Sequence, residues 1–396
     1  MKIPSWSLLL TLSVLGALSA LGVAPAHAGD SGGWVRLEAG ELRPVYGVQW
    51  VVRLSEPEPL DIHPSQWTTP LISADSSLTF VGTEQGVLHA LWTESGKELW
   101  KRRDLGKLGR AFGQVEDTLL AGADGALYGL ETYSGKERWH VDLGGVVGGE
   151  IVATGTIAIV PVRPNGYAAI DTRAGKVLWR VKRPKPEGIT VHGQAPARID
   201  RRGGRVFLGS SDGFVLAVQL GGGEALWSAK ISSAAQDEPF GDVDTRAVFT
   251  DGGARLVAAS YNGGLAGLDA ATGQIVWRNE SLLHVTSLVE VPGARWLVAS
   301  VGDGQVVGVD PANGRVRWRY KLAKGVPSQP VALDAGLVAV GSSHGPLAIL
   351  ESLNGRPLQV VTPGSGLSAN PCARGRHLAV WTNKGFALGL ELGQGP

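Results

Sequence analysis

The sequence predicts an all-β fold, an eight-bladed β-propeller built from four-stranded antiparallel blades. Three observations lead to this prediction: a repeat of about 40 residues, two glycine-containing turns in each repeat, and a tryptophan near the end of its last strand. A four-stranded repeat of this length is typical of a propeller blade. No segment shows a clear apolar period of 3.6 residues, so we expect almost no helix.

The first turn of the repeat carries a glycine that recurs eight times. These glycines are Gly86, Gly125, Gly166, Gly213, Gly263, Gly304, Gly345 and Gly385. Asp or Asn precedes several of them, and such pairs accept the positive φ angles of a tight hairpin. A second turn glycine follows nine or ten residues later in seven repeats, at Gly96, Gly135, Gly175, Gly223, Gly273, Gly314 and Gly355.

A tryptophan stands four residues after six of these second turn glycines, and Gln359 takes its place in the seventh repeat. A similar segment, residues 48–53, precedes the first complete repeat. Pairing it with residues 386–392 would complete blade eight and close the ring, whereas an open array would leave a long exposed edge. Such regular recurrence favours packing between blades over stacking on a ligand. The predicted structural tryptophans are Trp50, Trp100, Trp139, Trp179, Trp227, Trp277 and Trp318.

Composition excludes several classes of protein. Hydrophobic residues make up 43% of the 396 residues, which is enough for a large core and excludes extended disorder. The 37 Lys and Arg are balanced by 36 Asp and Glu, so nothing points to a nucleic-acid partner or to an anionic membrane surface.

The first 28 residues resemble a cleavable export signal. Lys2 is followed by an apolar stretch and by small residues at Ala26 and Ala28. We therefore expect a signal peptide at residues 1–28, an N-terminal extension at 29–47 and a single propeller domain at 48–392. A retained membrane helix is the alternative. No cysteine lies near the cleavage site, so we expect no lipid anchor there.

The search for catalytic motifs is negative. The sequence has no P-loop, no G-x-S-x-G and no H-E-x-x-H motif, and its eight histidines lack metal-ligand spacing. We therefore predict no catalytic residue, metal site or cofactor. Cys372 is expected to be a buried, inert thiol in the inner strand of blade eight. Asp171, Asp269 and Asp310 recur at the end of the third strand and are interpreted as turn residues.

The segments LAGLDAATGQIVW (265–277) and LYGLETYSGKERW (127–139) resemble the repeat of pyrroloquinoline-quinone-type propellers. Two families share this repeat, the quinoprotein alcohol dehydrogenases and the BamB family. Quinoprotein dehydrogenases are longer and place a disulfide of adjacent cysteines over the cofactor, whereas this chain has one cysteine. Residues 241–277 and 189–196 are similar to the BamB family outside the generic repeat.

The resemblance to the BamB family implies a non-catalytic periplasmic scaffold, held peripherally at the outer membrane. Such a scaffold assists folding and insertion of outer-membrane β-barrel proteins by binding the barrel-forming, BamA-like subunit, and nascent outer-membrane proteins are further candidate partners. Two alternatives stay open. One is a pyrroloquinoline-quinone-dependent periplasmic oxidoreductase, and the other is a generic secreted binding propeller with its ligand in the central channel.

Two connections are longer than the others, and both lie between one blade and the next, at residues 182–197 and 231–244. Insertions on one face of a repeat protein often mark its binding face. The family resemblance assigns partner contacts to Ile189, Val191, His192, Asp242 and Asp244. We expect an apolar centre with carboxylates on an exposed rim. His192 stands where the family usually has arginine, which removes a permanently charged bidentate donor. Alternatively, opposite charges on the two loops pair with each other.

Overall fold

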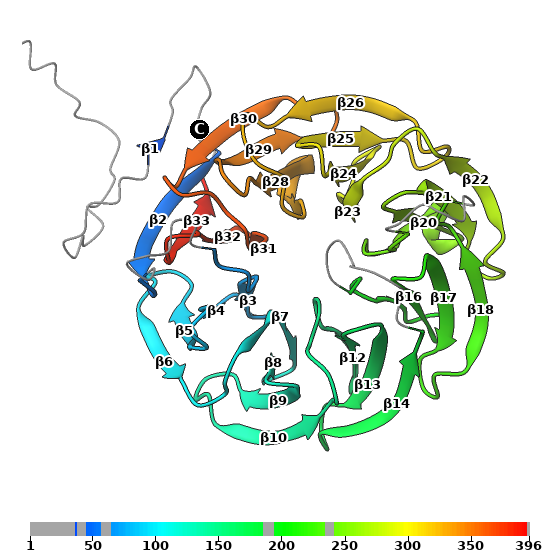
Figure 1. Ribbon diagram of the computed structural model, residues 1–396. Helices are drawn as coiled ribbons and strands as arrows, with labels where there is room; N and C mark the ends of the chain where they lie inside the picture. Colours follow the sequence, from blue (N-terminus) through cyan, green and yellow to red (C-terminus); the bar gives the residue numbers. More distant parts are fainter. Residues whose placement is uncertain (1–35, 38–44, 57–64, 185–193, 234–240, 394–396) are drawn as a thin grey trace, which may run out of the picture. The chain divides into compact units, whose positions relative to one another are not determined.

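The computed structural model describes residues 36–37, 45–56, 65–184, 194–233 and 241–393. The predicted signal peptide and most of the N-terminal extension lie outside the described residues. All described residues belong to one compact unit, 33–396. Its strands form eight antiparallel sheets arranged in a ring (Figure 1), which confirms the predicted eight-bladed β-propeller. In this part of the chain no helix is long and apolar enough to cross a membrane.

The first four blades each use four consecutive strands, ordered from the central channel outward. Blade one is β3 (Leu71–Ile72), β4 (Leu78–Gly82), β5 (Leu88–Trp92) and β6 (Glu98–Arg102); blade two is β7 (Leu108–Val115), β8 (Thr118–Ala123), β9 (Ala126–Glu131) and β10 (Glu137–Asp142); blade three is β11 (Val152–Thr154), β12 (Ile157–Val162), β13 (Gly166–Asp171) and β14 (Lys176–Lys182); blade four is β15 (Arg198–Asp200), β16 (Arg205–Gly209), β17 (Phe214–Gln219) and β18 (Ala225–Lys230).

The remaining blades follow the same plan, with two short 3-10 turns, η1 (Asp251–Gly253) and η2 (Asp334–Gly336). Blade five is β19 (Val248–Thr250), β20 (Arg255–Ser260), β21 (Gly264–Asp269) and β22 (Ile275–Asn279); blade six is β23 (Val285–Val289), β24 (Leu297–Val301), β25 (Gln305–Val309) and β26 (Val316–Lys321); blade seven is β27 (Val331–Leu333), β28 (Leu337–Gly341), β29 (Leu347–Glu351) and β30 (Pro357–Thr362); blade eight is β31 (Cys372–Arg374), β32 (His377–Trp381), β33 (Phe386–Leu392) and β2 (Tyr46–Arg53).

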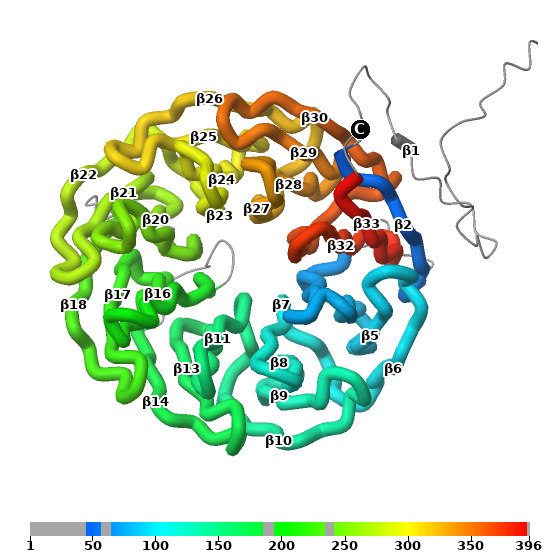
Figure 2. The backbone as a smooth tube through the Cα atoms, turned by 180° about the vertical axis from the view of Figure 1, so that it is seen from behind, coloured from blue at the N-terminus to red at the C-terminus, as the bar shows by residue number. Residues whose placement is uncertain are grey.

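The ring closes because the two ends of the chain share blade eight. Strand β2 pairs antiparallel with β33, from Tyr46 opposite Leu392 to Arg53 opposite Phe386. Figure 2 shows the blue N-terminal strand beside the red C-terminal strands. This pairing confirms closure by an N-terminal strand in the last blade. In addition, β1 (Arg36–Leu37) pairs with the outer strand β30 and makes blade seven five-stranded.

The core lies between neighbouring blades. The second strands, such as β4 and β8, are buried along their whole length because both faces of the blade are covered. The outer strands alternate instead. In β14, for example, Trp179 is buried whereas Leu178 and Arg180 are exposed. Continuous apolar runs therefore mark the inner part of each blade, and alternation marks its outer edge.

Each repeat tryptophan packs against a glycine in the second turn of the next blade. Trp318 illustrates the arrangement, since its indole lies between Gly308 of its own blade and Gly355 of blade seven. All seven second turn glycines have positive φ angles. A Cβ built on any of them would come within 2.3–2.7 Å of the facing indole ring. Six of the seven indoles also donate to a backbone carbonyl of the next blade, as Trp318 does to Ser352 at 2.9 Å.

Candidate functional site

The loops that connect one blade to the next share a face of the ring with the first turns of the blades. We call this the connecting-loop face. The backbone N–H of Leu143 donates to the carbonyl of Gly125 at 2.9 Å, and that of Ser343 donates to Val326 at 3.0 Å. Each of these bonds joins a connecting loop to a first turn. Among the described residues, the loop and turn positions joined in this way are therefore held together on one face.

Two of the five predicted partner-binding residues lie in the described part of the chain. Asp242 and Asp244 stand on the connecting loop before β19, whereas Ile189, Val191 and His192 lie outside the described residues. The N–H of Val243 donates to the Ser210 carbonyl at 3.1 Å, and the N–H of Tyr261 donates to the Asp242 carbonyl at 3.0 Å. The loop is thus attached to the first turns of blades four and five.

The expected exposed rim of carboxylates is wrong for Asp242. This side chain is only 2% exposed, because its loop is pressed between two first turns. Asp244 is half-buried and faces the central cavity. Asp242 is therefore buried, whereas Asp244 is partly exposed at the cavity, so the two carboxylates are not equivalent.

Arg183, on the first long loop, is already paired with a carboxylate of blade four. The Arg183 guanidinium forms an ion pair with Asp212 in the first turn of that blade, and it lies 4.5 Å from the centroid of the Phe214 ring. Lys182, also on this connection, is exposed, whereas the charged residues Lys185, Glu187, Asp237 and Glu238 of the two loops lie outside the described residues. For Arg183, the carboxylate partner is thus in a turn and not on the neighbouring loop.

Exposed apolar side chains recur on the connecting-loop face. Trp67, Val146, Leu283 and Val326 each stand in a different connecting loop and are 38–53% exposed. Exposed large side chains beside polar turns suit a surface that binds another protein. The opposite face also exposes such side chains, at Trp92, Tyr133 and Leu353 at or next to second turns, so exposure alone does not single out this face. Sequence reasoning missed the four residues on the connecting-loop face because they fall outside the two long loops.

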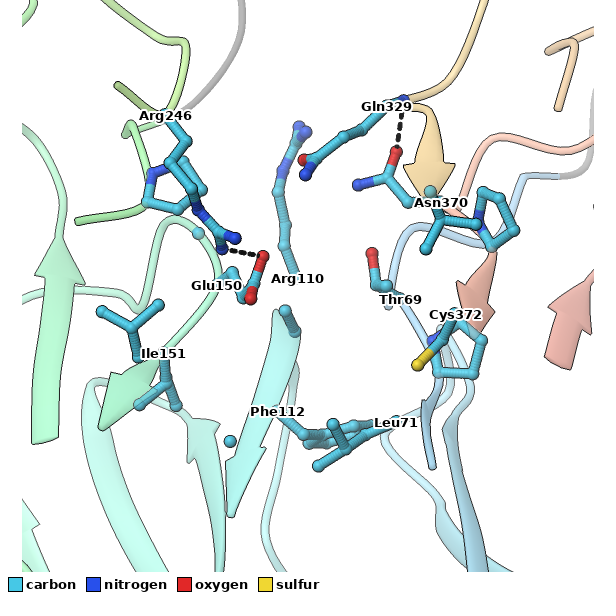
Figure 3. Close-up of a pocket in the computed structure, with 18 of the residues that line it drawn as sticks. Thr69, Leu71, Arg110, Phe112, Glu150, Ile151, Arg246, Gln329, Asn370 and Cys372 are labelled. Atoms are coloured by element: carbon cyan, nitrogen blue, oxygen red, sulfur yellow. Dashed lines mark hydrogen bonds and ion pairs between the residues drawn. The ribbon is translucent and has the colours of Figure 1, made fainter. Parts of the chain in front are cut away.

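The axis of the ring holds a cavity of about 640 Å³ to which all eight blades contribute (Figure 3). Five polar residues each stand two positions before the first residue of an innermost strand: Thr69, Glu150, Arg246, Gln329 and Asn370. Arg110 joins them from an irregular part of β7. Equivalent positions in a closed ring converge on its axis. We call these six residues the channel ring.

Contacts across the cavity order the channel ring. Arg246 of blade five forms an ion pair with Glu150 of blade three. The N–H of Gln329 donates to Oδ1 of Asn370 at 2.9 Å, which joins blades seven and eight. The Arg110 guanidinium lies 5.3 Å from the centroid of the Trp67 ring. Loss of hydration on burial lowers the pKa of Arg110.

Cys372 also lines the cavity, from the inner strand of blade eight as expected. Burial, and to a lesser extent the charge of Glu150, raise the pKa of its thiol to about 11. In the described part of the chain, no three His, Cys, Asp or Glu side chains form a group able to hold a metal ion. With one cysteine and no such group, these residues do not fit a metal–quinone site of the dehydrogenase type.

Sequence reasoning missed the channel ring. A signal was present, because proline directly follows Thr69, Gln329 and Asn370. Proline disfavours helix in the residue before it and favours extended backbone there. Aligning the repeats on these dipeptides would have placed the three polar residues at one level of the channel.

Comparisons with known proteins agree with this geometry. The sequence model of a family described as outer membrane protein assembly factor BamB matches residues 84–281 and 264–393. A BamB from Shewanella oneidensis is 30% identical over 146 residues, which cover 35% of this chain and 35% of the relative. The chain spans 35–59% of the length of the first curated relatives that it matches.

Two solved structures show the same fold. BamB from Moraxella catarrhalis superposes with a TM-score of 0.68 at 21% identity, covering 89% of this chain and 99% of that one. A quinohemoprotein alcohol dehydrogenase from Comamonas testosteroni reaches a TM-score of 0.69 at 14% identity, covering 89% of this chain and 77% of that one. At these identities the likeness concerns the fold alone.

Proposed function

The chain belongs to the BamB family of outer membrane protein assembly factors, and from this premise we propose that it is a non-catalytic scaffold for outer-membrane protein assembly. Its role is to bind the barrel-forming, BamA-like subunit and so to assist folding and insertion of β-barrel proteins. The observation that carries the proposal is the match of the family across residues 84–393, which includes both connecting loops before blades four and five.

The connecting-loop face is the docking surface in this proposal. Its rigidity supports the role, since a surface fixed by backbone hydrogen bonds loses little conformational entropy on binding. Its exposed apolar side chains supply area that a partner can bury. Ile189, Val191 and His192 contribute directly to the contact. Asp242 contributes by holding the loop, because its side chain is buried.

Asp244 has a different part in the proposed contact. Its half-buried carboxylate stands where the docking surface meets the central cavity. A charge at such a border acts mainly on the rate of encounter and on its salt dependence. We expect Asp244→Lys to slow association more than it speeds dissociation.

The proposal places the protein in the periplasm, held at the outer membrane by its partner. The export-signal-like residues 1–28 support export of the chain. In this proposal the partner supplies the membrane contact. Washing membranes with high salt or urea should then disrupt the complex and so release the protein from the membrane.

An oxidoreductase is the competing function, because the quinohemoprotein fold is so similar. Adding pyrroloquinoline quinone and calcium to the purified protein separates the two. Cofactor fluorescence that saturates with protein, together with dye-linked alcohol oxidation, would favour the enzyme. The scaffold predicts neither signal.

The scaffold itself is tested by affinity capture from solubilised membranes of cells that express the tagged chain. We expect mass spectrometry to identify the barrel-forming subunit in near-stoichiometric amounts. A tagged Ile189→Asp, Val191→Asp variant with unchanged melting temperature is the matched control and should lose this subunit. Failure of the wild-type chain to retain the barrel-forming subunit would overturn the proposal.

A further inference from the structure

We propose that the channel ring is a binding site for a monocarboxylate with an apolar tail, adjoining the docking surface, which shares Trp67 with the cavity. The inference starts from the charges that line the cavity. Among the described lining residues, Arg110, Arg246 and Arg374 carry guanidinium groups, and Glu150 and Asp244 carry carboxylates. The cavity thus holds one positive charge in excess.

Arg110 and Arg374 are the two guanidinium groups of the cavity that form no ion pair with a described carboxylate, and of these Arg110 also feels the opposing charges of Asp244 and Arg163. Arg246 is paired with Glu150. Arg374 donates from Nε to the Ile72 carbonyl at 3.2 Å. Within the described chain, no carboxylate lies within 4.0 Å of the Arg110 guanidinium, which reaches into the middle of the cavity between Arg246 and Gln329 (Figure 3). The guanidinium lies over the face of the Trp67 ring.

A guanidinium is a planar fork that matches a carboxylate with two parallel hydrogen bonds. Partial loss of hydration, followed by the charge of Arg163, lowers the pKa of Arg110, although its side chain is still exposed within the open cavity. The side-chain amides of Gln329 and Asn370 also line the cavity, and each can donate to the same anion. A monoanion would balance the single excess positive charge of the cavity. A di- or trianion would leave the cavity with a net negative charge beside Glu150 and Asp244.

The apolar part of the cavity wall indicates what the rest of the ligand should be. Leu71, Phe112 and Ile151 line the side of the cavity away from Arg246 and Gln329 (Figure 3). A volume of about 640 Å³ is within the usual range for small-molecule sites. The carboxylate would therefore sit at the level of Arg110, and an aliphatic group would extend down between the inner strands.

Two sources offer this chemistry, a free aliphatic acid and the C-terminal carboxylate of a polypeptide. Calorimetric titration of the purified full chain with four probes distinguishes them. The probes are hexanoate, hexanamide, N-acetyl-leucyl-leucine and the C-terminal amide of that dipeptide. We expect each acid to bind at least tenfold more tightly than its amide, a difference typical of a charge-assisted hydrogen bond. The acid that binds more tightly identifies the source.

Three variants locate the site. Arg110→Gln should weaken binding of the preferred acid at least tenfold, and Arg110→Lys should weaken it by a smaller factor. Glu150→Gln should tighten binding a few-fold, because it frees Arg246 and adds to the positive charge. Arg103→Gln is the matched control, since Arg103 is exposed and does not line the cavity.

Thermal melts of each variant show whether the fold is kept. Equal affinities for acids and amides, no binding of any probe, or wild-type affinity in Arg110→Gln would overturn the proposal. All titrations use the chain without its partner. Their outcome is therefore independent of whether the connecting-loop face binds the barrel-forming subunit.

Discussion

The side-chain amide of Gln359 binds the backbone of Tyr46 where the two ends of the chain meet. Oε1 accepts the N–H groups of Val45 and Tyr46 at 2.8 and 2.7 Å, and Nε2 donates to the Tyr46 carbonyl at 2.7 Å. Gln359 occupies the place that tryptophan has in the other repeats. Blade eight has no second turn here, because its outer two strands come from opposite ends of the chain, so an indole would find no turn glycine. An amide instead satisfies the backbone groups of the incoming strand.

Gln359→Ala should destabilise the propeller at this seam. Three hydrogen bonds to buried backbone are lost, and the expected decrease in the free energy of unfolding is roughly 2–4 kcal/mol. Chemical denaturation measures the change. Gln274→Ala, at an exposed position in a second turn, is the control and should change stability by no more than about 0.5 kcal/mol. If Gln359→Ala is as stable as this control, the three hydrogen bonds contribute nothing to the stability of the propeller.

Two N-terminal truncations test closure of the ring. Deleting residues 29–54 removes β2, and with it Trp50 and the partner of β33. We expect a large fall in melting temperature and exposure of a strand edge that promotes aggregation. Deleting only residues 29–44 should be mild, since of this segment the structure pairs only Arg36 and Leu37 with β30. Equal melting temperatures would contradict the closure of blade eight by β2.

The fold could be predicted from the sequence because each repeat is defined by residues close together in the chain. Turn glycines such as Gly355 and tryptophans such as Trp318 recur at fixed spacing, and their pairing across blades follows from the repeat. The burial of Asp242 could not be predicted in this way. It depends on two hydrogen bonds to turns that lie more than 15 residues away in the chain. The channel ring likewise becomes visible only when eight blades close around one axis.

The contact between Gly355 and Trp318 should be intolerant of a single methyl group. Gly355 has φ +73°, and an added Cβ would lie 2.3 Å from the Trp318 ring. Gly355→Ala should therefore lower the free energy of unfolding by more than the roughly 1–2 kcal/mol that a left-handed backbone conformation alone costs a residue with a Cβ. Gly252→Ala isolates that backbone cost, because Gly252 has φ +65° and open space around its Cα. Urea unfolding of both variants gives the difference, and equal losses would mean that the indole moves aside.

Cys372 should be almost unreactive in the folded protein. At pH 8 a thiol with a pKa of about 11 is ionised in about one molecule in a thousand, whereas an unfolded thiol near pKa 9.0 is ionised in about one in ten. Alkylation by iodoacetamide should be about 100-fold slower in the native state than in denaturant, and its rate should rise with pH up to about 11.

The same pKa shift has a consequence for stability. The folded state keeps the Cys372 thiol neutral, so its contribution is present below pH 9 and is lost as the pH rises towards 11. Glu150→Gln should speed native-state alkylation, because the Glu150 charge helps to raise this pKa. Native and unfolded chains that react at equal rates would contradict the raised pKa of this half-buried thiol.

The most direct test of the scaffold is the affinity of the purified protein for the periplasmic part of the barrel-forming subunit. We predict that the Ile189→Ala, Val191→Ala double variant loses roughly 1–2 kcal/mol of binding free energy per side chain, with an unchanged melting temperature. Leu226→Ala, Val276→Ala is the matched control, because both side chains are 43–50% exposed but lie on the outer strands β18 and β22. Wild-type affinity in the loop variant, or an equal loss in the outer-strand control, would contradict docking through the connecting-loop face.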